Sequence, residues 1–129
     1  MNRVKQHNIK VKRSYDDYAP EDGIRLLVDR LWPRGRTRES LHIAGWFKNL
    51  APSNELRKNY HQGAMDYPEF CEKYRAALAE NPAAKEFLSL VKAYLDEQDV
   101  TLLFSSKNQA ENNATALRDY IQDQLGISG

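Results

Sequence analysis

The order of the apolar segments constrains the fold of this chain more than any other feature of its sequence. Residues 24–29 and 100–105 each contain a short apolar run that is typical of a buried strand, and a long passage with helical periodicity separates them. Such a passage permits a crossover between parallel strands, which a short turn cannot connect. We therefore expect an α/β protein with a small parallel or mixed sheet and helices packed on it.

A further strand is predicted near the amino terminus. Residues 8–13 alternate between the apolar Ile9 and Val11 and two lysines, which indicates a strand with one face toward water. Residues 14–23 then form a polar loop that contains proline and glycine. Because this loop is short, the pattern alone leaves open the direction of the first strand relative to the second.

Several helices are predicted between and after the strands. Four apolar residues recur at helical spacing and predict a short helix, namely Ile43, Trp46, Phe47 and Leu50. Ser53 and Asp66 are suited to cap the next two helices, and Pro82 is suited to open a third. The final helix is expected from about residue 109 to residue 125, where Gly126 provides a stop.

Length and charge limit the organisation of the chain and its partners. Its 129 residues, 41% of them hydrophobic and 29% charged, suit one compact domain over residues 1–129. The formal net charge of +1 gives no global basic field, so an anion site has to come from local clustering. Nucleic acid stays open as a partner, but sequence-specific reading of a duplex is not expected. The oligomeric state is not predicted.

Cysteine and histidine usage bears on the compartment and on metals. The single Cys71 rules out an intramolecular disulfide and a multi-cysteine metal site, which fits a reducing compartment. His7 and His42 have no companions at ligand spacing, so we expect no metal and no cofactor. No apolar run approaches the roughly 20 residues that span a bilayer, and the amino terminus lacks the apolar core of a signal peptide. A cytoplasmic location without a membrane partner is therefore expected.

Polar and mostly basic residues follow each of the three expected strands. Ligands of α/β sheets usually bind outside the carboxyl ends of the strands, and parallel strands bring those ends to one rim. The candidate ligand-binding residues on this rim are Arg13 and Tyr15 after the first strand, Arg30, Trp32, Arg34 and Gly35 after the second, and Ser105 and Lys107 after the third.

Residues 29–38 are the most unusual of these segments, because four arginines stand there against one aspartate, Asp29. Arginine presents a planar fork of donors that matches carboxylate and phosphate. Trp32 offers a flat face, and Gly35 would let a ligand approach the backbone closely. The segment is therefore interpreted as an anion-binding loop. The alternative is a solvated loop whose arginines pair with Asp or Glu and whose tryptophan fills the core.

Two further groups of candidates lie on helices or beside them. Arg57 and His61 are four residues apart, so on a helix they bring a cation and a titratable imidazole to one face, unless they are a chance pair at an exposed helix end. Ser105 and Lys107 precede the last helix, whose dipole favours an anion, although ordinary N-capping explains a serine there equally well. Asn112, in the expected first turn of that helix, is placed to point at the same rim.

The segment LVDRLWPRG at residues 27–35 resembles the signature of the YeaO-like proteins, a bacterial family in the domain-of-unknown-function group 488. Residues 13–16, 50–58 and 102–108 match as well, so the resemblance covers nearly the whole chain. It implies an α/β fold, a small three-layer sandwich with a short, mainly parallel sheet and helices packed on it. Because longer relatives place a helix between the first two strands, it also favours parallel pairing of those two. It implies no established activity.

The resemblance bears on the candidate site in two places. His61 matches a family histidine just after the helix that carries Arg57, which strengthens its candidacy. Family members often carry His beside the asparagine of the last helix, where this chain has Asn113. A mechanism that needs an imidazole at that place is therefore in doubt here.

Three functions follow as hypotheses. The first is a module that binds a small anionic ligand, which bears phosphate or carboxylate and includes nucleotides, in the arginine-rich cleft. The second is an enzyme, a hydrolase or transferase, with Asp29 as base or orienting carboxylate and His61 as acid–base; no nucleophile is predicted. The third is a structural or protein-interaction module in which the arginines form internal ion pairs.

Overall fold

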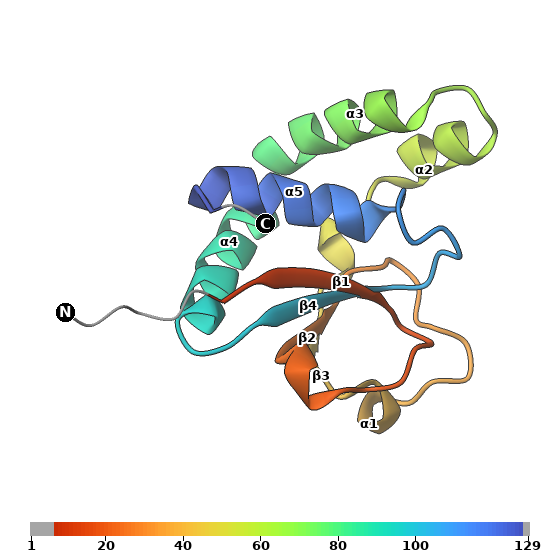
Figure 1. Ribbon diagram of the computed structural model, residues 1–129. Coiled ribbons are helices and arrows are strands. Elements are labelled where there is room, and N and C mark those ends of the chain that lie inside the picture. The colour runs from red at the N-terminus through yellow and green to blue at the C-terminus, as the bar shows by residue number, and fades with distance from the viewer. Residues whose placement is uncertain (1–6, 128–129) are drawn as a thin grey trace.

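Four parallel strands run through the centre of the computed structural model, which describes residues 7–127 (Figure 1). The strands are β1 (Ile9–Arg13), β2 (Ile24–Leu27), β3 (Ile43–Trp46) and β4 (Val100–Phe104). Their spatial order is β1-β4-β2-β3, and every pairing is parallel, with Leu102 of β4 beside both Val11 and Leu26. The predicted parallel sheet is confirmed, and its strands all end at one edge.

The strand β4 takes a central place in the sheet because it is buried along its whole length. All of its residues are buried, and a strand that is covered on both faces has to be apolar throughout. It pairs with β1 on one side and with β2 on the other. The expectation that β1 and β2 pair with each other is therefore wrong, since the more buried β4 lies between them, although the two strands do run in the same direction.

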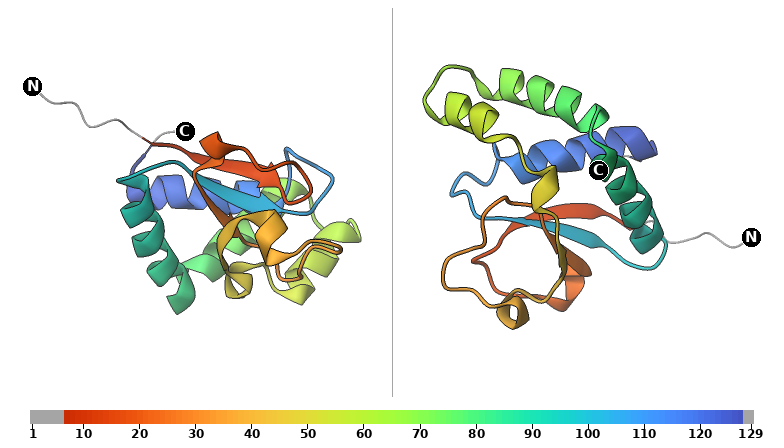
Figure 2. Two further views of the ribbon diagram at one scale, coloured as in Figure 1. Left: turned by 90° about the horizontal axis from the view of Figure 1, so that it is seen from below. Right: turned by 180° about the vertical axis from the view of Figure 1, so that it is seen from behind.

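Helices of very different size cover the two faces of the sheet (Figures 1 and 2). On one face, α4 (Pro82–Leu95) and α5 (Asn113–Leu125) pack against the strands, α3 (Tyr67–Ala79) packs on α5, and α2 (Asn54–His61) packs on α3. The opposite face carries the single turn of α1 (Arg38–Leu41) and the loops beside it. The fold is the expected three-layer α/β sandwich, with one thick and one thin outer layer.

Each face of the sheet has its own hydrophobic cluster. The larger cluster joins the sheet to the thick helical layer and includes Leu26, Val28, Leu102, Phe104, Phe70, Tyr74, Phe87, Val91, Leu117 and Ile121. The smaller cluster lies under α1 and consists of Leu27, Leu41 and Leu103, with Trp32, Ile43 and Trp46 packed against it. Successive residues of a strand point to opposite faces, which is why β2 and β4 are apolar at nearly every position.

The segment predicted as a helix over residues 43–50 forms β3 and a short 3-10 turn, Lys48–Leu50, instead. Gly45 is a poor helix former, and a Cβ atom there would lie only 2.8 Å from the ring of Phe47. The backbone of β3 pairs with β2, and the N–H of Phe47 adds a hydrogen bond of 2.8 Å to the carbonyl of Leu27. Pairing with the sheet therefore outweighs the helical spacing of the apolar residues.

The predicted helix starts are confirmed for α2, α3 and α4, whereas α5 starts later than expected. The caps of the first three are Ser53, Asp66 and Asn81, whose side chains each accept a hydrogen bond from a backbone N–H. The last helix begins at Asn113 because Asn108 accepts from two following backbone N–H groups and turns the chain first. Ala110, which the expected helix would have included, is exposed in the resulting loop. No helix within residues 7–127 has the length and apolar character needed to cross a membrane.

Candidate functional site

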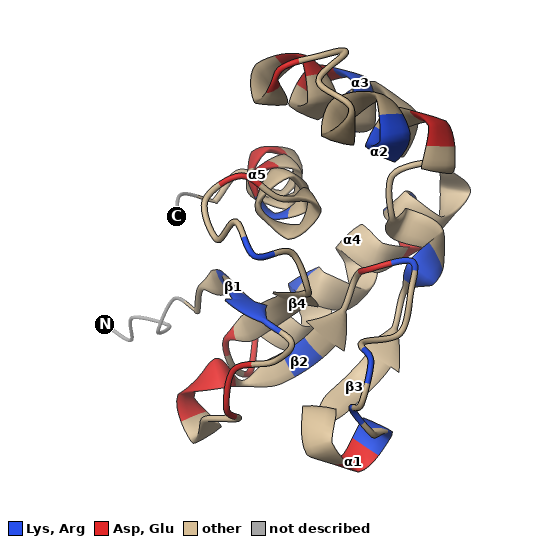
Figure 3. Ribbon diagram, turned by 90° about the vertical axis from the view of Figure 1, so that its right-hand side faces the viewer, with Lys and Arg blue, Asp and Glu red and all other residues tan. Residues whose placement is uncertain are grey.

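A hollow of about 310 Å³ opens at the edge of the sheet where β1, β2 and β4 end. Figure 3 faces this edge and shows basic segments on α2, on the loop before α1 and on the loop after β4. Four distant stretches of chain converge on the hollow, with one residue of α3. The lining residues are Tyr15, Asp29, Arg30, Leu31, Trp32, Pro33, Arg34, Ala51, Pro52, Arg57, Tyr60, His61, Phe70, Ser105, Ser106, Glu111, Asn112 and Asn113.

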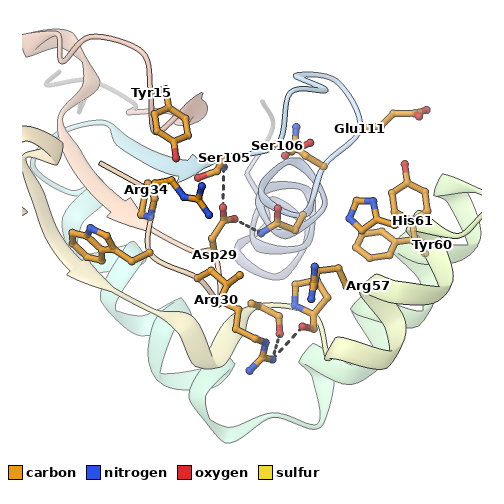
Figure 4. A pocket seen from close by; sticks show the side chains of 18 residues that line it. Tyr15, Asp29, Arg30, Arg34, Arg57, Tyr60, His61, Ser105, Ser106 and Glu111 are labelled. Atoms are coloured by element: carbon orange, nitrogen blue, oxygen red, sulfur yellow. Dashed lines mark hydrogen bonds between the residues drawn. The ribbon is translucent and has the colours of Figure 1, made fainter. Parts of the chain in front are cut away.

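Asp29 stands in the middle of this wall, two residues beyond the end of β2 (Figure 4). One carboxylate oxygen accepts the backbone N–H of Ser105 at 2.8 Å, and the other accepts the side-chain amide of Asn113 at 2.9 Å. Its own backbone carbonyl accepts the indole N–H of Trp46 at 2.7 Å. Burial raises the pKa of the Asp29 carboxyl above its ordinary value, and the hydrogen bonds from Asn113 and Ser105 offset part of that rise.

Arg30 is turned away from the centre of the hollow and holds two parts of the chain together (Figure 4). Its Nη2 donates to the carbonyl oxygens of Ala51 at 3.4 Å and Pro52 at 3.1 Å. The Nε atom of Arg30 is buried, and no hydrogen-bond partner for it exists within the described part of the chain. This guanidinium therefore anchors the segment before α2 to the loop after β2.

Arg34 and Arg57 are exposed side chains on opposite sides of the hollow (Figure 4). Arg34 lies beside Asp29, and Arg57 projects from α2. Between residues 7 and 127, neither guanidinium forms a salt bridge to an aspartate or glutamate, whereas other cations of the chain do. Two arginines with unused donors therefore flank a half-buried carboxylate.

Aromatic side chains form much of the remaining wall. Tyr15 is 39% exposed at one side of the hollow, and Tyr60 packs against Phe70 with ring centroids 4.8 Å apart on the other. Burial and the negative charge of Glu111 raise the pKa of the Tyr60 hydroxyl. His61, at the end of α2, is exposed and lies 5.5 Å from the ring of Tyr60. A flat ligand would meet ring surfaces on two sides.

Three of the predicted ligand-binding residues do not line the hollow. Arg13 donates to the carbonyl oxygens of Ser106 at 2.9 Å and Ser105 at 3.1 Å, so it holds the loop after β4 in place. Lys107 is exposed outside the wall. Gly35 has a φ of 79°, which explains the glycine by backbone conformation, and it also lies outside the wall, so no close approach of a ligand requires it.

Trp32 and Asn112 line the hollow, but their polar groups are occupied. The indole N–H of Trp32 donates to the carbonyl of Arg36 at 2.6 Å, and its ring packs edge-on against Trp46. The side chain of Asn112 caps α5 by accepting the N–H of Thr115 at 2.8 Å. Both residues therefore shape the wall through packing and capping.

Several lining residues were not among the predicted site residues. Tyr60 and Phe70 lie on α2 and α3, and helical periodicity does not reveal that one end of an apolar stripe borders a hollow. Ala51 and Pro52 fall in a segment that matched the family resemblance, and that match was a signal that could have identified them. Ser106 also falls in a matched segment, whereas Glu111 carried no such signal, since its position depends on how the loop before α5 turns.

The arrangement suits the binding of a charged group better than it suits proton transfer. Asp29 and His61 stand apart across the hollow in Figure 4, and both oxygens of the aspartate already accept hydrogen bonds. His61 has no carboxylate partner in the described chain that would orient its ring. In residues 7–127, no three His, Cys, Asp or Glu side chains gather in a way that could hold a metal ion.

Comparisons with known proteins place the chain among uncharacterised relatives. A family model described as "Inactive DUF488-N3 subclade" matches residues 8–128. The chain is 42% identical to the uncharacterised protein YeaO of Escherichia coli over 116 residues, which cover 89% of this chain and 97% of the relative. It is 33% identical over 114 residues to the uncharacterised protein Rv3073c of Mycobacterium tuberculosis, covering 88% of this chain and 93% of the relative. No solved structure matches the chain significantly.

Proposed function

We propose that this chain, which belongs to the YeaO-like DUF488 family and within it matches the subclade described as inactive, binds a small anionic ligand in the hollow at the strand ends. The ligand bears a phosphate or a carboxylate group, as nucleotides do. The observation that carries the proposal is the pair of exposed arginines, Arg34 and Arg57, which face one hollow without carboxylate partners in the described chain. We also propose that the protein is located in the cytoplasm.

The size and chemistry of the hollow support a small ligand. Its volume of about 310 Å³ lies within the range of about 300–1,000 Å³ that is usual for small-molecule sites. Guanidinium groups bind phosphate and carboxylate through paired N–H donors, and the rings of Tyr15 and Tyr60 provide apolar surface for the rest of the ligand.

The alternative of an enzyme has less support. The matched subclade is described as inactive, and Asn113 occupies the place where family members often carry His. An asparagine neither takes up nor releases a proton near neutral pH, so the contact between Asp29 and Asn113 positions a carboxylate without relaying a proton. The alternative of internal ion pairs also has less support, because Arg30 bonds to carbonyl oxygens instead of carboxylates.

A ligand screen by thermal unfolding tests the proposal. Inorganic phosphate, nucleoside monophosphates, sugar phosphates and dicarboxylates are added to the full chain at millimolar concentration. A ligand present at about 100 times its Kd stabilises the folded state by about 2.7 kcal/mol, which raises the unfolding midpoint by several degrees in a domain of this size. If none of these anions shifts the midpoint, the proposal fails.

Matched arginine variants then locate the binding site. Arg34→Ala and Arg57→Ala should each weaken a binding anion by about tenfold or more, since each removes charge-assisted hydrogen bonds. Lys58→Ala and Arg38→Ala remove exposed cations close in sequence that do not line the hollow, so they should leave affinity nearly unchanged. Equal losses in all four variants would indicate general electrostatic attraction in place of a site.

A further inference from the structure

The carboxylate of Asp29 has unused acceptor capacity that faces the hollow. An ionised carboxylate offers about four lone-pair positions. The Ser105 N–H and the Asn113 amide fill two of them, and the side chain of Ser105 lies close enough to lower the pKa of the carboxyl as well. Asp29 lines the hollow between Arg34 and Arg57 (Figure 4), so a ligand inside the hollow can reach its carboxylate.

The charge of Asp29 also lacks a counter-ion. Within residues 7–127 no lysine, arginine or histidine forms a salt bridge to it. A half-buried carboxylate without a cation is destabilising, and its burial accordingly raises its pKa. Two other aspartates of low exposure, Asp22 and Asp99, are paired with cations. Asp29 differs from both of them in having no such partner.

A ligand that carries only an anionic group would provide partners for the arginines of this site but not for Asp29. It would compensate Arg34 and Arg57 but would bring a second negative charge close to Asp29. A ligand that carries N–H donors as well as an anionic group would satisfy all three side chains together. The aromatic walls at Tyr15 and Tyr60 favour a flat shape for the donor-bearing part.

We propose that the ligand carries, besides its anionic group, an edge of two parallel N–H donors, and that Asp29 selects it by accepting both. Such an edge occurs in guanine, through its ring N–H and amino group, and in guanidino compounds. Both sources offer a carboxylate the same paired geometry. The inference rests on the proposed function, because the anionic group is held by Arg34 and Arg57, and it adds Asp29 as the residue that determines specificity.

Titration calorimetry with two matched ligand pairs tests the inference on the full chain. Guanosine monophosphate and inosine monophosphate differ by one amino group. Arginine and lysine are both cations, but only the planar guanidinium of arginine presents two parallel N–H donors. In at least one pair the donor-rich member should bind about tenfold more tightly, as expected for a hydrogen bond to a charged group. The pair that shows the preference identifies the source of the donor edge. Equal affinities within both pairs would overturn the inference.

Variants assign the preference to Asp29. Asp29→Asn should reduce the difference within the responding pair to about twofold or less, whereas Glu55→Gln, which removes an exposed carboxylate outside the hollow, should keep it. A preference that survives in Asp29→Asn would overturn the role of Asp29. If that variant does not fold, the wild-type ligand pairs alone decide the outcome.

Inorganic phosphate separates this inference from the proposed function. Phosphate needs only the arginines, so its binding should weaken in Arg34→Ala and Arg57→Ala. Binding of phosphate without a preference in either ligand pair would leave the proposed function standing and remove the donor edge. No binding of phosphate or of any of the four paired ligands would remove both.

Discussion

The side-chain amide of Asn113 donates a hydrogen bond of 2.9 Å to the carboxylate of Asp29, so the first residue of α5 is tied to the loop after β2. The backbone N–H of Ser105 donates to the other oxygen at 2.8 Å. One carboxylate therefore joins the ends of β2 and β4 to the start of α5. The hollow exists where it does because these three stretches meet around Asp29.

The burial of Asp29 predicts a pH-dependent contribution to stability. Burial raises the pKa of its carboxyl above 3.8, so the folded protein takes up this proton at higher pH than the unfolded chain does. Above the raised pKa, the ionised Asp29 lowers the free energy of unfolding. As the pH falls toward the ordinary pKa of aspartate, the carboxyl is protonated and this loss of stability disappears. The free energy of unfolding of the wild type, measured in urea relative to Asp29→Asn, should therefore rise from about pH 7 to about pH 4.

The comparison with Asp29→Asn removes the contributions of other carboxylates. Asp22 and Asp99 have lowered pKa values and act in the opposite direction, but they are present in both proteins. A difference between the two proteins that is constant or decreases toward low pH would contradict the prediction.

The buried ion pair between Asp22 and Arg25 predicts a large loss when it is broken. The Arg25 side chain is 0% exposed and that of Asp22 is 8% exposed. Asp22→Ala leaves the guanidinium buried without its partner, which should cost about 3–5 kcal/mol in urea unfolding. Asp123→Ala breaks the exposed pair with Arg75 and should cost at most about 1 kcal/mol. Similar losses in both variants would show that burial does not decide how much an ion pair contributes to stability.

The same ion pair predicts a loss of stability in acid. Burial by itself would raise the pKa of Asp22, but hydrogen bonds from Lys12, the Ala19 N–H and Arg25 outweigh it and hold the pKa below 3.8. The contribution of Asp22 is therefore complete above about pH 4 and is lost as the pH falls through its lowered pKa. In Asp22→Asn, the free energy of unfolding should therefore fall less steeply at low pH than in the wild type. An unchanged fall would show that other groups cause it.

Two glycines with positive φ predict unequal costs of substitution. Gly23 has φ +69°, and a Cβ there would lie 2.0 Å from the carbonyl oxygen of Asp99. Gly63 has φ +79° with open space around the same position. Gly63→Ala should therefore cost about 1–2 kcal/mol from backbone strain alone, and Gly23→Ala should cost clearly more. Thermal unfolding of the two variants compares them, and equal midpoints would contradict the steric argument.

The hydroxyl of Tyr74 predicts a measurable contribution from one buried hydrogen bond. Tyr74 is 1% exposed and donates to the backbone carbonyl of Leu50, which joins α3 to the turn before α2. Tyr74→Phe leaves that carbonyl without this donor and should cost about 1–3 kcal/mol in urea unfolding. Tyr94→Phe, on the partly exposed face of α4, should change stability much less. A loss in the second variant as large as in the first would contradict the prediction.

Local patterns predicted most of the fold because they report on neighbouring residues. The caps Ser53, Asp66 and Asn81 begin helices wherever the chain places them, since a cap bonds to backbone groups within the next turn. The failure at β3 has the opposite origin. Its apolar spacing suits a helix, but the free edge of β2, more than a dozen residues earlier, provides backbone partners that a helix could not use.

The candidate site was predicted in part. The rule that ligands bind at strand ends led to Asp29, Arg34 and Ser105, and helical spacing led to Arg57; all four line the hollow. The same rule also led to Arg13, which lies at a strand end but whose guanidinium donates to carbonyl oxygens of the neighbouring loop. A position at the end of a strand indicates where a residue lies, but it does not indicate which hydrogen-bond partners its side chain has.

By itself, the sequence determined the α/β class, the buried strands β2 and β4 and the concentration of arginine after β2, because hydrophobic period, capping residues and composition are local properties. Only the tertiary structure decided that Arg30 is occupied by backbone carbonyl oxygens while Arg34 and Arg57 have no carboxylate partners in the described chain, and that Asp29 lies between those two arginines. The physical reason is that the partners of a long side chain come from segments far away in sequence, and their distance is set by the packing of β4 and α5 in the core.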